Sequence, residues 1–150
     1  MAFWQRYPRL LEIAYAGTDR LLAFLRPWLR PGGRTERLFV VGERLSKGPL
    51  FNCQMCGQCV LHSTGMTCPM NCPKNMRNGP CGGVRPNGHC EIRPEMTCVW
   101  LQAWERSSRM PLYGSDIHQV LPPLDRRRQG SSAWLNELNG LAEPPPGWTP

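Results

Sequence analysis

The clearest hydrophobic pattern in the chain lies near its start, where apolar residues recur at helical spacing between residues 10 and 28. The apolar positions are Leu10, Leu11, Ala14, Leu21, Leu22, Leu25 and Trp28, and the intervening arginines include Arg6, Arg9, Arg20, Arg26 and Arg30. Pro27 and the turn Pro31-Gly32-Gly33 end this pattern. We therefore expect a basic amphipathic helix in this segment.

A second short helix is expected from about Glu36 to Leu45, although the run Leu38–Val41 is equally compatible with a strand. The simplest role for both N-terminal elements is to cover the metal core. Two alternatives stay open. The elements could dock onto a partner protein, or residues 1–30 could lie on an acidic membrane surface, which the pattern favours least.

The middle of the chain, residues 51–98, has almost no hydrophobic periodicity and is interrupted by many glycines and prolines. All eight cysteines lie between Cys53 and Cys98. A backbone of this composition is expected to wrap around metal in irregular loops, without building a sheet. We therefore predict a small metal-stapled domain with irregular cysteine-rich loops, a few short α-helices and little or no β-sheet.

After the cysteines, a helix is expected from about Thr97 to Arg109, and a short helix capped by Ser131 or Ser132 should run through Asn139. Within the first of these, Trp100 and Trp104 are expected to pack beside Cys98, with an interface role as the alternative. The predicted organisation has four parts: a helical N-terminal segment, a cysteine-rich domain, a C-terminal docking segment and a disordered tail. They span residues 1–46, 47–112, 113–142 and 143–150.

Composition narrows the functional classes. The chain has 150 residues, of which 16 are proline and 15 glycine, so a staple such as a metal or a partner is expected. The formal charge of +7 arises mainly from residues 1–50, which hold nine basic and four acidic side chains. No signal peptide and no membrane-spanning apolar run is visible. A cytoplasmic location is therefore expected, and there cysteines bind metal more often than they form disulfides.

The cysteine spacing is Cys53-x2-Cys56-x2-Cys59-x8-Cys68-x3-Cys72-x8-Cys81-x8-Cys90-x7-Cys98. Structural zinc is usually held by pairs of cysteines, which leaves the third cysteine of the first triplet without a natural role. Three thiolates on one tight loop suit three irons of one cube. The favoured prediction is two [4Fe–4S] clusters, and zinc and disulfides stay as alternatives.

The spacing does not fix which cysteine serves which cluster. Our prediction assigns Cys53, Cys56, Cys59 and Cys98 to one cluster, and Cys68, Cys72, Cys81 and Cys90 to the other. Three histidines, His62, His89 and His118, are expected to be exposed or to lie behind the ligands. Three cations near the cysteines, Lys74, Arg77 and Arg85, would raise a cluster's reduction potential if they face it, and otherwise they are solvated charges.

Several motifs in order resemble one known family. The first is Cys53-Gln54-Met55-Cys56-Gly57-Gln58-Cys59, and the later ones are Thr64–Lys74, Arg77–Gly83, Gly88–Glu91, Cys98–Arg106, Pro122–Arg126 and Gly130–Asn136. Together they cover about residues 47–140. This stretch resembles the methylenetetrahydrofolate reductase C-terminal domain family, whose stand-alone form is called MetV.

The resemblance implies a cytoplasmic iron–sulfur subunit that passes electrons to or from the FMN or FAD of a TIM-barrel reductase subunit. That partner interconverts 5,10-methylenetetrahydrofolate and 5-methyltetrahydrofolate, and a further electron donor or acceptor is implied. The chain itself shows no phosphate-cradling glycine loop and is too short for a (β/α)₈ barrel, so it is not expected to catalyse the reduction alone. Two alternatives stay open: a zinc-stapled module that only stabilises or positions the reductase, and a basic zinc module that binds nucleic acid. Nucleic-acid binding is not expected, because the basic residues lie on an apolar helix and not around the metal loops.

Overall fold

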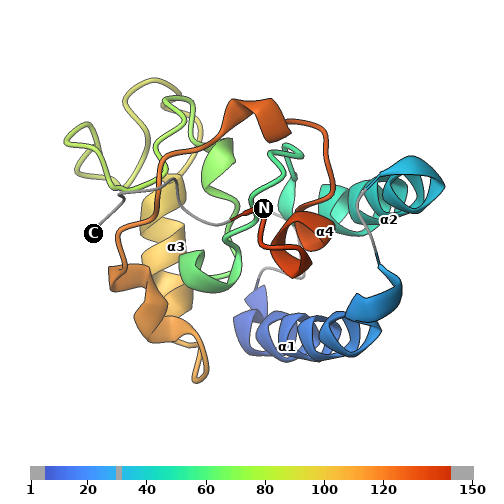
Figure 1. Ribbon diagram of the computed structural model, residues 1–150. Coiled ribbons are helices and arrows are strands. Elements are labelled where there is room, and N and C mark those ends of the chain that lie inside the picture. Colours follow the sequence, from blue (N-terminus) through green and yellow to red (C-terminus); the bar gives the residue numbers. More distant parts are fainter. Residues whose placement is uncertain (1–5, 30–31, 143–150) are drawn as a thin grey trace.

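The computed structural model describes residues 6–29 and 32–142. Four α-helices lie in this part of the chain: α1 (Pro8–Leu25), α2 (Gly33–Phe51), α3 (Val99–Ser107) and α4 (Ala133–Leu138). Short 3₁₀ turns join them at η2 (Arg26–Trp28), η3 (His62–Thr64), η4 (Pro69–Asn71), η5 (Gly114–His118) and η6 (Arg126–Arg128). Figure 1 shows α3 on one side of the molecule and α1, α2 and α4 on the other; the first part of the cysteine-rich segment, in green, lies between them, and the later loops, in yellow-green, lie beyond the upper end of α3.

The helical, sheet-poor class predicted from the sequence is confirmed. Within the described residues, β-pairing is limited to two isolated bridges, Val84 with Cys90 and His89 with Thr97. Two details differ from the prediction. Helices α1 and α2 are long, with 18 and 19 residues, and the strand alternative for Leu38–Val41 is wrong because α2 runs through it.

Helix α1 starts at Pro8, a residue that suits the first helical turn because its missing N–H would have no helical partner there. The inner face of α1 carries the fully buried Glu12, whose carboxylate accepts hydrogen bonds from the backbone N–H groups of Leu112 (2.8 Å) and Tyr113 (2.7 Å). Leu11 and Tyr15 pack on the core from the same face. Helix α1 therefore packs on the hydrophobic core, whereas its predicted role as a cover for a metal core stays a prediction.

The outer face of the two long helices is apolar and exposed. Leu10, Ile13, Leu21, Phe24 and Trp28 form a row along α1 and η2, with exposed fractions between 59% and 73%. Leu38, Val41 and Leu45 continue this character on α2. Several positions of the predicted amphipathic pattern thus face outward, because Glu12 and Ala16 occupy the buried side of α1. We call these eight residues the outer apolar face.

The later helices agree with the sequence pattern. Helix α3 falls inside the range expected for it, and α4 begins after Ser132, whose hydroxyl accepts a hydrogen bond from the backbone N–H of Leu135. Predictions that concern residues 1–5, Arg30, Pro31 and the tail 143–150 lie outside the described residues. None of the described helices is long and apolar enough to cross a membrane.

Two small hydrophobic clusters replace one large core. The first contains Phe51, Leu61, Met66, Cys68 and Met110, and α1 packs against it. The second contains Cys98, Trp100 and Ala103. Each cluster includes a cysteine, so the apolar interior and the cysteine loops are built around one another.

Gly65 lies where the cysteine-rich loop contacts α3. Its backbone has the left-handed φ of +59°, and it lies so close to α3 that an added Cβ would overlap the carbonyl oxygen of Ala103. Nearby, the buried Arg106 of α3 donates a 2.7 Å hydrogen bond to the hydroxyl of Thr67. The cysteine loop is therefore fixed against α3 by backbone contact and by a buried side-chain bond.

Candidate metal centre

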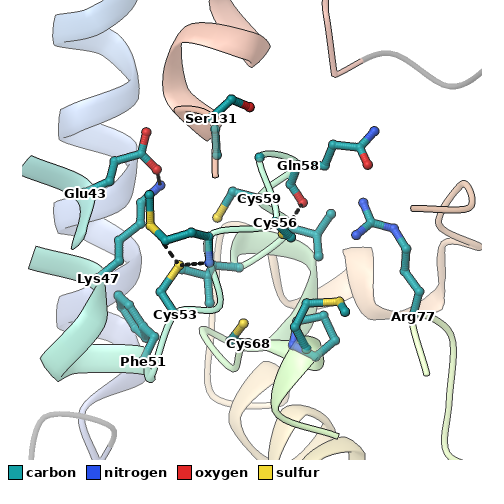
Figure 2. A pocket seen from close by; sticks show the side chains of 17 residues that line it. Glu43, Lys47, Phe51, Cys53, Cys56, Gln58, Cys59, Cys68, Arg77 and Ser131 are labelled. Carbon is teal, nitrogen blue, oxygen red and sulfur yellow. Dashed lines mark hydrogen bonds and ion pairs between the residues drawn. The ribbon is translucent and has the colours of Figure 1, made fainter. Parts of the chain in front are cut away.

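The first candidate site is a pocket surrounded by the thiols of Cys53, Cys56, Cys59 and Cys68 (Figure 2). Helix α2 leads into it: the helix ends at Phe51, and Asn52 adopts the left-handed conformation (φ 50°) that turns the chain into the loop. Within the loop, Gly57 also has a positive φ of +74° and packs against the backbone of Arg128. These two turns bring the cysteine triplet around one space.

Backbone N–H groups point at three of these sulfurs from two residues further along the chain. The N–H of Met55 donates to Cys53 Sγ over 3.4 Å. The Leu61 and Met70 N–H groups do the same for Cys59 and Cys68. Burial raises the pKa of the Cys59 thiol to about 11 and of the Cys68 thiol to about 12, although these bonds oppose the shift. Hydrogen bonds of this kind stabilise a thiolate more than a thiol.

A buried lysine lies on one side of this pocket. Lys47 is 4% exposed, its ammonium lies 2.8 Å from the Glu43 carboxylate, and it sits 4.1 Å from the centre of the Trp134 ring. Burial lowers the pKa of Lys47, but the negative charges of Cys59 and Glu43 outweigh burial and leave this pKa raised. Lys47 is therefore a fixed positive charge at the wall of the pocket.

An arginine faces the same pocket from the opposite side (Figure 2). Arg77 Nε donates a 2.7 Å hydrogen bond to the carbonyl oxygen of Pro122. Its Nη1 atom is buried and has no hydrogen-bond partner among the described residues. A buried guanidinium nitrogen without an acceptor is costly, so its position fits a pocket that holds negative charge. A [4Fe–4S]²⁺ cube together with its four thiolate ligands has a net charge of about −2, and this donor set and these two cations suit such a group.

The second candidate site is lined by Cys72, Cys81, Cys90 and Cys98. Backbone bonds bring the last two together: the Cys90 N–H donates to Met96 O over 3.0 Å and the Cys98 N–H to Gly88 O over 2.9 Å. The remaining wall is mostly apolar and includes the buried ring of Trp100. The one charged residue among those that line it is Lys74, which is exposed and forms an ion pair with Glu91.

Each of the two pockets is lined by four cysteines, and these sets differ from our assignment at two positions, while the ligand assignment itself stays a prediction. Cys68 lies with the triplet and Cys98 with the second set, so these two exchange places. Cys98 stands at the start of α3, beside Cys90, whereas Cys68 belongs to the first hydrophobic cluster, next to Leu61. None of the eight cysteines forms a disulfide. In the described residues, no three or more histidine, cysteine or carboxylate side chains are arranged to hold a metal ion.

The other predicted site residues fall in several places. Trp100 packs beside Cys98, whereas Trp104 is 54% exposed and contacts His118 edge-on. None of the three histidines lines either cysteine pocket. Arg77 lines the first pocket and Lys74 the second, whereas Arg85 lines neither.

Sequence reasoning missed the C-terminal half of the first site. Gly130 donates its backbone N–H to Met55 O (2.8 Å), and Asn136 donates its side-chain amide to Gly57 O (2.8 Å). Glu43 accepts from the Ser132 hydroxyl and, over 3.1 Å, from the backbone N–H of Trp134. The spacing of Glu43 and Lys47 is that of a helical ion pair, the one sequence signal that could have drawn attention to them.

The fold and the two pockets define a small, mostly helical, cysteine-rich protein with two four-cysteine sites. Residues 33–127 match the model of the family described as methylene-tetrahydrofolate reductase C terminal. The chain therefore belongs to this family, as the motifs predicted. Searches of curated proteins and of solved structures found no match.

Proposed function

We propose that this chain is an iron–sulfur electron-transfer subunit of a methylenetetrahydrofolate reductase. The observation that carries the proposal is the first pocket, where four thiols share one space with a buried ammonium and a buried, unpartnered guanidinium nitrogen. Positive groups and backbone N–H donors around sulfur favour an anionic metal–thiolate cluster. Family membership supports the link to the reductase.

In this proposal the cluster ligands are Cys53, Cys56, Cys59 and Cys68 for the first site. The second set is Cys72, Cys81, Cys90 and Cys98. Each [4Fe–4S] cluster, when bound, supplies one-electron transfer, and the flavin of the partner supplies the two-electron chemistry of the folate. The residues of this chain bind the clusters, exclude water with apolar walls, and set the local charge.

The proposed partner is the flavin-containing reductase subunit, and the outer apolar face is its proposed docking surface. Exposed apolar residues that gather on one face of a helix, as on α1, are typical of interaction sites. The exposed charges beside them are mostly basic and include Arg9 and Arg20 on α1 and Arg37 and Arg44 on α2. A matching surface on the partner would therefore be an apolar groove with an acidic rim.

Metal analysis tests the proposal directly. Protein purified without oxygen should be brown and contain about eight iron and eight sulfide per chain, since two cubes hold four of each. Replacing a ligand in one site, for example Cys56→Ala or Cys81→Ala, should remove about half of the iron. A colourless protein with stoichiometric zinc and no iron would instead support the zinc-stapled accessory module.

A further inference from the structure

The two cysteine sites differ in the charges that face them. The first has Lys47 on one side and Arg77 on the other, whereas the one charged lining residue of the second is Lys74. Lys74 donates a hydrogen bond to Cys81, but it is exposed and paired with Glu91, so solvent and its partner weaken its charge more than burial allows at the first site. Lys47 is 4% exposed, and the Nη1 atom of Arg77 is fully enclosed.

Glu43 offsets part of the Lys47 charge because the two groups are paired at 2.8 Å. The Glu43 carboxylate, however, also accepts bonds from Ser132 and from Trp134, on the α4 side. In Figure 2, the Lys47 ammonium lies on the cysteine side of Glu43, so the positive end of the pair faces the sulfurs. No carboxylate of the described residues forms an ion pair with Arg77.

Reduction adds one electron to a cluster and no proton, and the charge of the thiolate-ligated cube changes from about −2 to about −3. A buried positive charge stabilises the reduced form more than the oxidised form, and backbone N–H bonds to sulfur act in the same direction. The first site has both features, with N–H donors at Cys53, Cys59 and Cys68.

We propose that the first site, Cys53, Cys56, Cys59 and Cys68, holds the cluster of higher reduction potential, and that Arg77 and Lys47 are the positioning charges that make it so. This inference rests on the proposed function, because it requires a cluster in each site. Electrons that enter the chain from a one-electron donor would therefore reside first at the site beside α2. The second cluster, with its apolar wall, would be reduced only at lower potential.

A redox titration of the anaerobically purified, iron-loaded chain, with dithionite as reductant, tests this ordering by EPR. Two one-electron steps are expected for the unaltered protein. Arg77→Gln should move the higher step to lower potential and leave the lower step in place. Arg77→Lys, which keeps the charge, should restore most of the loss. Lys74→Met is the matched control at the second site, and it should leave the higher step unchanged.

Lys47→Met should move the higher step in the same direction as Arg77→Gln. This substitution also leaves Glu43 buried without its partner, which can destabilise the site. The iron content of Lys47→Met is therefore measured first. If this variant loses iron, the result for Arg77→Gln decides the question. A shift of the lower step, an equal shift of both, or no shift in iron-loaded Arg77→Gln overturns the ordering and leaves the proposed function intact. Protein without iron overturns both.

Discussion

At the scale of single residues, Gly65 is a position where the backbone leaves no room for a side chain. It combines a φ of +59° with contact to the backbone of α3 at Ala103. Gly65→Ala should lower the free energy of unfolding by about 2–4 kcal/mol, because the left-handed conformation costs about 1–2 kcal/mol and a backbone carbonyl cannot easily move away from the new methyl group. Chemical denaturation of the iron-loaded protein, followed by circular dichroism, measures this loss.

The matched control is Gly42→Ala in the middle of α2. Gly42 has no neighbour within 4 Å of an added Cβ and no positive φ. The same substitution there should raise stability by about 1 kcal/mol, since alanine is the better helix former. If both alanines changed stability equally, close approach at Gly65 would not be the cause.

The sequence showed the eight cysteines as one constellation but not how the fold arranges them. The structure places them around two pockets, four at each, and their role as metal ligands stays a prediction. The exchange of Cys68 and Cys98 depends on long-range contacts: Cys98 is held by Gly88, and Cys68 packs against the first hydrophobic cluster. Such contacts leave no periodic signal in the sequence.

At the scale of elements, a hydrogen bond between α4 and α2 links these two helices beside the first site. Ser132 caps α4 and also donates its hydroxyl to the buried Glu43 of α2. Ser132→Ala should lower the free energy of unfolding by about 2–4 kcal/mol, because the cap is worth about 1 kcal/mol and a buried carboxylate loses a donor. Thermal unfolding of the loaded protein should show the loss, and Ser132→Thr should recover most of it.

Ser46→Ala is the matched control for this prediction. Ser46 lies on the same helix, exposed, and its hydroxyl bonds back to backbone carbonyls of its own helix, to Gly42 O over 2.7 Å and to Glu43 O over 3.4 Å. Its removal should change stability by no more than about 0.5 kcal/mol. A comparable loss in both variants would contradict a specific link between α2 and α4.

The helices themselves could be predicted from the sequence, but their orientation could not. The pattern from Leu10 to Trp28 correctly predicted a helix. It did not reveal that Glu12 is turned inward, because a carboxylate is normally assigned to the surface. Glu12 is buried since two backbone N–H groups of the loop after α3, at Leu112 and Tyr113, bind its carboxylate. Once Glu12 faces the core, Leu10, Leu21 and Trp28 must face outward.

At the scale of the whole molecule, this inversion leaves an apolar surface that a second macromolecule can cover. The row on α1 and η2 is straight, since its members are separated by three, four or eight residues along the helix. A helix presented in this way fits a groove on a partner protein. The first cysteine site is lined by the inner side of α2, at Glu43, Lys47 and Phe51, so a reductase bound to the outer face of α2 would be separated from this site by the helix.

The triple substitution Ile13→Ser, Leu21→Ser and Phe24→Ser should therefore weaken binding of the coexpressed flavin reductase subunit by about tenfold or more, because buried aromatic and aliphatic anchors carry most of an interface's free energy. The iron content should stay unchanged, since these side chains are exposed and away from the cysteines. The control is Leu112→Ser with Val120→Ser, which removes apolar side chains of similar exposure (57% and 52%) from the segment after α3. Two outcomes would show that the outer apolar face serves something other than this partner. One is loss of reductase binding in the control alone. The other is binding of the unaltered chain to anionic vesicles, if the triple substitution abolishes it while the reductase stays bound.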